Sequence, residues 1–123
     1  QCTWFAWGKF YEMYGYDPGF GGNGKQCVEQ LLWAHPDKFY ASTEPATGAV
    51  FSTVPFNNDA PGHVGIITKV DGDMVTYFDG NYNNYNDSFE RAQTDWKMET
   101  VTLEEFRQRY GSKVHFANPV VHL

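Results

Sequence analysis

Hydrophobic residues recur at helical spacing in two segments near the start of the chain. In residues 3–14 aromatic side chains return every three or four positions, which predicts a helix that ends at Gly15. Residues 26–35 predict a second helix, which Pro36 ends, and a short helical piece is expected around 37–40. The aromatic positions of the first helix are Trp4, Trp7, Phe10 and Tyr11.

After Pro45 the pattern changes to short apolar runs that are typical of strands. The strongest run is 63–70, which the tight turn 71–73 (Asp-Gly-Asp) connects to a returning strand at 74–78. The polar stretch 79–95 is expected to be mostly loop. Weaker strands are predicted at 48–53, 96–101 and 114–117.

A last helix is predicted to begin at Thr102, because Glu105 stands three residues later and completes a capping box. This helix is expected to run to residue 109 or 110, with Gly111 ending it. Helices therefore come first and strands dominate the rest of the chain. Segregated elements of this kind predict an α+β fold in which N-terminal helices pack on an antiparallel β-sheet.

The size and the net charge of the chain indicate a single domain that does not bind nucleic acid. The 123 residues fit one domain, 1–123, and the abrupt start at Gln1-Cys2 indicates a piece of a larger multidomain protein. The net charge of -6, without any cluster of Lys or Arg, argues against nucleic-acid binding. No apolar run is long enough to span a membrane.

The chain has two cysteines, Cys2 and Cys27, which are too few for a disulfide framework, although a single bridge between them stays open. Zinc-type spacings such as C-x-x-C are absent, so no structural metal site is predicted. Cys27 has the apolar neighbours Val28, Leu31 and Leu32, which favour a small core residue.

Cys2 stands directly before the first predicted helix. A thiolate at that place would face unsatisfied N–H groups and the positive end of the helix dipole, both of which lower a thiol pKa. From position alone, a nucleophile and an inert buried cysteine are equally good interpretations of Cys2.

His63 opens the strongest strand, from which an imidazole can project toward a cleft and exchange protons near neutral pH. A hairpin centred on Gly72 would place Asn81 opposite His63, since each lies nine residues from the glycine. Asp79 or Asn81 could then hold the ring in one tautomer, as the third member of a triad. Asn81 is slightly better placed by this pairing, and a turn-forming Asp-Gly-Asn is the alternative interpretation.

Aromatic residues make up 18% of the chain, more than a small core needs. Trp4 and Trp7 are predicted to be core residues of the first helix. Candidates for a substrate-binding groove wall are Tyr77, Tyr82 and Tyr85, because they flank Asp79 and Asn81.

Three ordered motifs together resemble the CHAP family, the cysteine, histidine-dependent amidohydrolases/peptidases. They are Gln1-Cys2-Thr3-Trp4-Phe5-Ala6-Trp7-Gly8, Gly62-His63-Val64-Gly65-Ile66-Ile67 and Asp79-Gly80-Asn81. The resemblance covers most of the chain and implies a papain-like (NlpC/P60-like) fold. It also implies cleavage of bacterial peptidoglycan, as an N-acetylmuramoyl-L-alanine amidase or as a stem or cross-bridge endopeptidase.

Carried over by motif, the resemblance makes Cys2 the nucleophile and His63 the general base and then acid. Asp79 matches an acidic position that is more often Glu in the family, and Asn81 matches the polar position two residues on. Gln1 matches the residue before the nucleophile. Together with the Cys2 backbone N–H, it would stabilise the oxyanion of the reaction intermediate. Some members of the family bind calcium in a loop just ahead of the nucleophile, and this chain has no residues there. We therefore predict no cofactor and no catalytic metal. A bound calcium ion without a catalytic role is the alternative.

The leading hypothesis is therefore a lytic module of a phage lysin, a phage tail protein or a bacterial wall hydrolase. Such a module would act outside the cell or in the cell wall, and other domains of the parent protein would supply wall binding. A non-catalytic wall-binding module that keeps the fold is the second hypothesis. A cysteine protease or transamidase acting on protein is the third.

Overall fold

The computed structural model describes residues 2–53, 62–80, 96–111 and 113–121. Within these residues six strands form one sheet in the order β1-β6-β2-β3-β4-β5, and every neighbouring pair is antiparallel. The strands are β1 (Phe39–Ser42), β2 (Val50–Ser52), β3 (Val64–Asp71), β4 (Met74–Gly80), β5 (Trp96–Thr102) and β6 (His115–Pro119). The helices are α1 (Cys2–Tyr14), η1 (Gly24–Gln26), α2 (Cys27–Ala34) and α4 (Leu103–Tyr110). The predicted α+β class is confirmed.

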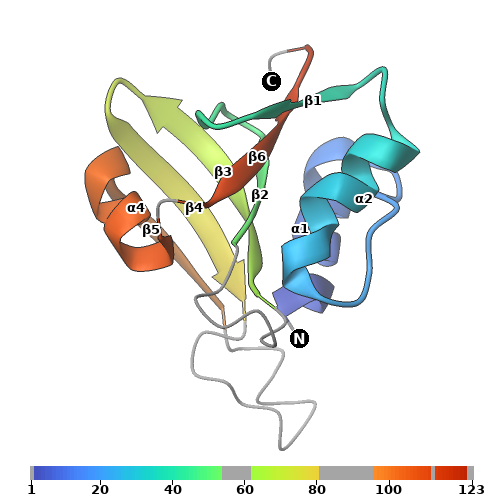
Figure 1. Cartoon of the computed structure of the whole chain (residues 1–123), viewed down its shortest axis with the longest axis horizontal. Coiled ribbons are helices and arrows are strands. Elements are labelled where there is room, and N and C mark those ends of the chain that lie inside the picture. Colours follow the sequence, from blue (N-terminus) through green and yellow to red (C-terminus); the bar gives the residue numbers. More distant parts are fainter. Residues whose placement is uncertain (1, 54–61, 81–95, 112, 122–123) are drawn as a thin grey trace, which may run out of the picture.

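Helices cover both faces of the sheet (Figure 1). α1 and α2 pack on one face through a largely aromatic core, in which the Phe10 ring is fully buried against Phe20 and Phe39. α4 packs on the opposite face, where the buried Phe106 ring contacts Phe51. The sheet is therefore the middle layer of three, and any side chain on β4 faces either α1 or α4.

The capping box at the start of α4 is confirmed. The Thr102 hydroxyl accepts from the Glu105 backbone N–H at 3.1 Å, and the Glu105 carboxylate accepts from the Thr102 N–H at 3.3 Å. The helix ends at Gly111, as predicted. Local sequence thus fixes both ends of α4, and this determines which residues form its last turn.

The β3–β4 hairpin has a different register from the simple symmetric one. Its turn has two residues, so that Asp71 pairs with Met74 beside it. A β-bulge at 67–69 then shifts the pairing by one residue, and Gly65 lies opposite Asp79. Beyond the bulge, Gly65 and Asp79 are each seven residues from Gly72, as in the predicted symmetric hairpin. The extra residue in the bulge compensates for the two-residue turn, which is not centred on Gly72.

One expectation about the secondary structure of the first forty residues is wrong, and the packing of α1 adds a feature that the sequence does not predict. The segment 37–40 is not helical: a turn at 36–38 leads into β1, which pairs with β6. The face of α1 that packs on the sheet is formed by residues such as Phe5 and Phe10, whereas Tyr11 is 51% exposed. An aromatic-rich helix offers more than one apolar stripe, and only packing against the sheet decides which is buried.

Candidate active site

His63 is held in place through its backbone, just before β3 begins. Its N–H donates to the Thr53 hydroxyl at 2.9 Å, and its carbonyl accepts from the Thr53 N–H at 3.0 Å. On the other side, Gly24 of η1 lies so close that a Cβ there would come within 2.7 Å of the His63 carbonyl carbon. Only glycine fits at this contact. The buried Ser52 hydroxyl donates to the Gly24 carbonyl at 2.7 Å and so fixes η1 on β2.

The His63 imidazole is hydrogen-bonded to Asp79 near the end of β4. Asp79 Oδ1 contacts the ring at Nε2. The Asp79 residue is only 3% exposed, whereas the His63 side chain is 24% exposed. An ionised carboxylate can only accept, so the ring donates from Nε2 and the carboxylate favours this tautomer. The arrangement orients an imidazole whose edge reaches solvent.

Tyr110, the last residue of α4, completes this group, although sequence reasoning did not include it. Its hydroxyl donates to Asp79 Oδ2, and its ring stacks on His63 with parallel planes (2°) and centroids 5.7 Å apart. Burial, and next the charge of Asp79, raise the pKa of Tyr110 far above its ordinary value. The hydroxyl is therefore a donor throughout the neutral range.

The start of α1 lies at the end of the sheet where β3 begins and β4 ends (Figure 1). Phe5 packs on Gly80 so closely that a Cβ on Gly80 would overlap the phenyl side chain. The Thr3 hydroxyl donates to the Gly22 carbonyl at 2.8 Å, which ties the first turn of α1 to the loop that carries Gly24. The Cys2 backbone begins α1, so its N-terminal end is fixed beside both β4 and the segment that holds His63.

Several predicted site residues fall outside the described parts of the chain. Gln1, Asn81, Tyr82 and Tyr85 lie outside the described residues, as does the side chain of Cys2. The oxyanion role of Gln1, the orienting role of Asn81 and the groove role of the two tyrosines therefore stay predictions.

Tyr77 does not line a groove. Its side chain is fully buried under α4, where its hydroxyl donates to Glu99 Oε2 at 3.1 Å and accepts from Arg109. Alternation along β4 places Tyr77 on the same face as Asp79, and α4 covers that face at Tyr77.

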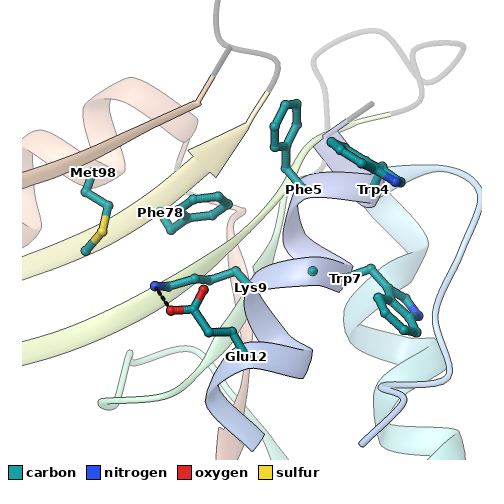
Figure 2. Close-up of a pocket in the computed structure, with 8 residues that line it drawn as sticks. Trp4, Phe5, Trp7, Lys9, Glu12, Phe78 and Met98 are labelled. Atoms are coloured by element: carbon teal, nitrogen blue, oxygen red, sulfur yellow. Dashed lines mark hydrogen bonds and ion pairs between the residues drawn. The ribbon is translucent and has the colours of Figure 1, made fainter. Parts of the chain in front are cut away.

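A groove of about 660 Å³ opens on the other face of the sheet, between α1 and the strands β4 and β5. Figure 2 shows the Lys9–Glu12 ion pair (3.5 Å) beside the Phe78 ring, with Trp4 and Phe5 toward the start of α1. The prediction that Trp4 is a core residue is wrong, since it is 49% exposed, whereas Trp7 is partly buried against the core. The groove is lined by Trp4, Phe5, Lys9, Glu12, Phe78 and Met98, among others.

Cys27 carries a thiol and not a disulfide, which removes the open question of a Cys2–Cys27 bridge. Its buried Sγ donates to the Asn23 carbonyl at 3.5 Å, in agreement with a core role. Among the described residues, no three His, Cys, Asp or Glu gather closely enough to hold a metal ion. No helix in the described parts is long and apolar enough to cross a membrane.

An imidazole oriented by a buried carboxylate thus lies at the end of the sheet where the backbone of Cys2 begins α1. The CHAP domain family matches residues 1–81, about two thirds of the chain. The chain therefore belongs to the CHAP family, and the predicted family and papain-like α+β fold are confirmed. None of the curated proteins matches the chain.

Solved structures share the fold at low sequence identity. The N-acetylmuramoyl-L-alanine amidase from Staphylococcus aureus has a TM-score of 0.60 and 16% identity, over 97% of this chain and 30% of that one. Ly7917 with the hydrolyzing product of MDP has a TM-score of 0.55 and 21% identity, over 79% of this chain and 38% of that one. A second structure of Ly7917 has a TM-score of 0.54 and 21% identity, over 79% and 37%. This chain thus spans less than two fifths of each of these proteins.

Proposed function

We propose that this chain is the catalytic domain of a peptidoglycan hydrolase, which cleaves an amide bond with Cys2 as nucleophile and His63 as its base. The observation that carries the proposal is the orientation of His63 by the buried Asp79, at the end of the sheet where α1 begins. Membership of the CHAP family supports the reaction class.

The proposed chemistry has two halves. His63 takes the thiol proton of Cys2 at Nδ1, since Nε2 is engaged by Asp79. The thiolate sulfur attacks the amide carbonyl carbon, the C–N bond breaks, and His63 returns the proton to the departing amine, which leaves a thioester on Cys2. Water then gives a proton to His63 and attacks the thioester carbon. The acid product leaves, and the thiol regains its proton.

The structural neighbours support peptidoglycan as the substrate class, because one is named an N-acetylmuramoyl-L-alanine amidase. We assign the groove beside Phe78 to the part of the substrate that extends from the cut bond, because Trp4 lies in the helical turn that Cys2 begins. A ring with an exposed apolar face suits sugar or peptide. We place the enzyme outside the cell or in the wall, with other domains of the parent protein supplying wall binding.

The two cysteines provide a matched test. Cys2→Ala is expected to abolish the release of soluble fragments from purified peptidoglycan, whereas Cys27→Ala is expected to keep activity at a modest cost in stability. Mass spectrometry of the fragments identifies the cut through the new amino group, which distinguishes the amidase from the endopeptidase reaction.

Hydrolysis by a folded Cys2→Ala variant would refute the nucleophile. A wild-type chain that binds walls without cutting them would favour the non-catalytic binding module. Cleavage of proteins but not of peptidoglycan would favour a protease or transamidase.

A further inference from the structure

We propose that Tyr110 is a positioning residue, which locks the Asp79 carboxylate so that it presents one oxygen to His63. The inference rests on the proposed function for its effect on activity, while its structural content concerns the three side chains alone. Each carboxylate oxygen of Asp79 has its own partner: Oδ1 has the His63 ring and Oδ2 has the Tyr110 hydroxyl.

α4 is anchored so that its last turn can serve this role. Phe106 is fully buried, and its ring contacts the Tyr110 ring with centroids 4.9 Å apart. Arg109 reaches back to the sheet, where it donates to Glu99 Oε2 and to the Tyr77 hydroxyl. Phe106 and Arg109 thus fix the end of α4. Because the backbone of Tyr110 is already ordered, its contact with Asp79 costs little additional conformational entropy.

Tyr110 restrains both members of the Asp–His pair. Its hydroxyl fixes the rotation of the carboxylate, and its ring lies parallel to the imidazole at 2°. A carboxylate with one partner can rotate and offer either oxygen to Nε2, and the imidazole that it holds then loses its fixed orientation. When both Asp79 oxygens have a partner, the Nε2 proton of His63 has a single acceptor. The ring is then held in one orientation, and its Nδ1 atom always points the same way.

The hydroxyl also shares the negative charge of a carboxylate that is 3% exposed. Other charged or titratable residues near the pair include Lys97, opposite Asp79 on β5, Lys25 beside Gly62, and Tyr77, whose ring contacts Tyr110. Tyr110 contacts the carboxylate and the imidazole at once.

Tyr110 lies beyond residue 81, where the match to the CHAP family ends. The positioning contact therefore comes from α4, in the C-terminal part of this chain, which packs on the opposite face of the sheet from α1. A residue in that part would act on the reaction through Asp79 without touching substrate.

Tyr110→Phe tests the proposal, because it removes the hydroxyl and keeps the stacked ring. Tyr14→Phe is the matched control: its hydroxyl donates to the Gly48 carbonyl at 2.5 Å, on the other side of the sheet from α4. Proton–nitrogen NMR of the His63 ring is recorded in the Cys2→Ala background, with the signal assigned through His63→Gln. Peptidoglycan hydrolysis is measured separately with Cys2 intact.

We expect Tyr110→Phe to shift the Nε2–H signal of His63 and to expose that proton to faster exchange, by about ten-fold, as loss of one hydrogen bond to a charged group implies. We expect kcat to fall by about ten-fold with little change in KM. Tyr14→Phe should change neither.

An unchanged His63 spectrum in Tyr110→Phe would overturn the proposal, whatever the activity. A changed spectrum with unchanged kcat would also overturn it, because the contact would then be structural only. If Cys2→Ala still hydrolyses peptidoglycan, the proposed function fails, while the spectra still decide whether Tyr110 orients His63. Circular dichroism ensures that every variant is compared in its folded state.

Discussion

The close packing of Phe5 on Gly80 gives a sharp prediction. A Cβ on Gly80 would come within 2.2 Å of Phe5 Cβ and within 2.5 Å of its ring carbon Cδ2, whereas carbon atoms pack best at about 3.5–4.0 Å. The phenyl ring, which is 6% exposed, must therefore move by about 1 Å, and the first turn of α1 moves with it. Gly80→Ala should perturb both stability and the place of Cys2.

Overpacking of this kind costs about 2 kcal/mol. For a chain of 123 residues, about 1 kcal/mol corresponds to roughly 4 °C in Tm, so we expect Gly80→Ala to melt about 8 °C lower. Gly8→Ala in α1 is the matched control, since a Cβ there meets nothing within 4 Å. Its better helix propensity is worth about 1 kcal/mol and should raise Tm by about 4 °C.

Activity provides the second readout. A misplacement of about 1 Å at a reacting group costs up to about 100-fold in rate. At 25 °C, where both proteins are folded, Gly80→Ala should therefore release peptidoglycan fragments at least about ten-fold more slowly. A Gly80→Ala protein with unchanged Tm and full activity would refute the reasoning, because the close contact would then have no role in placing α1.

The other predictions concern the carboxylate, the groove and alkaline pH. Asp79→Asn should lower kcat by at least about 100-fold, and a larger effect of Asn81→Ala would reassign the orienting role. Trp4→Ala should raise KM for soluble peptidoglycan fragments several-fold at nearly unchanged Tm, and an unchanged KM would exclude the groove. Burial raises the pKa of Tyr14 and Tyr110 above 10.0, so above pH 10 the unfolded chain releases protons that the folded chain keeps. The free energy of unfolding should then fall by at least about 1 kcal/mol per pH unit in urea titrations, chiefly through the more deeply buried Tyr110, and a flat profile would contradict this burial.

The sequence predicted the parts of the site that depend on local signals. The hairpin from 63 to 78 and the capping box at Thr102 rest on turn and cap residues within a few positions of each other. The hairpin predicts that the segment 79–81 lies beside His63, but its symmetric pairing favours Asn81 over Asp79 as the orienting residue and does not predict the bulge at 67–69.

The remaining features depend on contacts between distant segments. β1 pairs with β6, whose residues lie 74 to 80 positions further along the chain, and only one of the four β1 residues is buried. Tyr110 reaches Asp79 across 31 residues, and only the docking of α4 on the sheet brings them together. The same docking buries Tyr77, which the sequence placed on a groove wall. Alternation indicates which residues share a face of a strand, but not which helix covers that face.

Alkylation of Cys2 tests the central claim most directly. In a Cys27→Ala protein, Cys2 is the only remaining thiol, so iodoacetamide labelling can be followed by mass while peptidoglycan hydrolysis is measured on the same samples. We predict that activity falls in proportion to the modified fraction and reaches zero when Cys2 is fully alkylated. Hydrolysis that continues after complete alkylation of Cys2 would contradict the account.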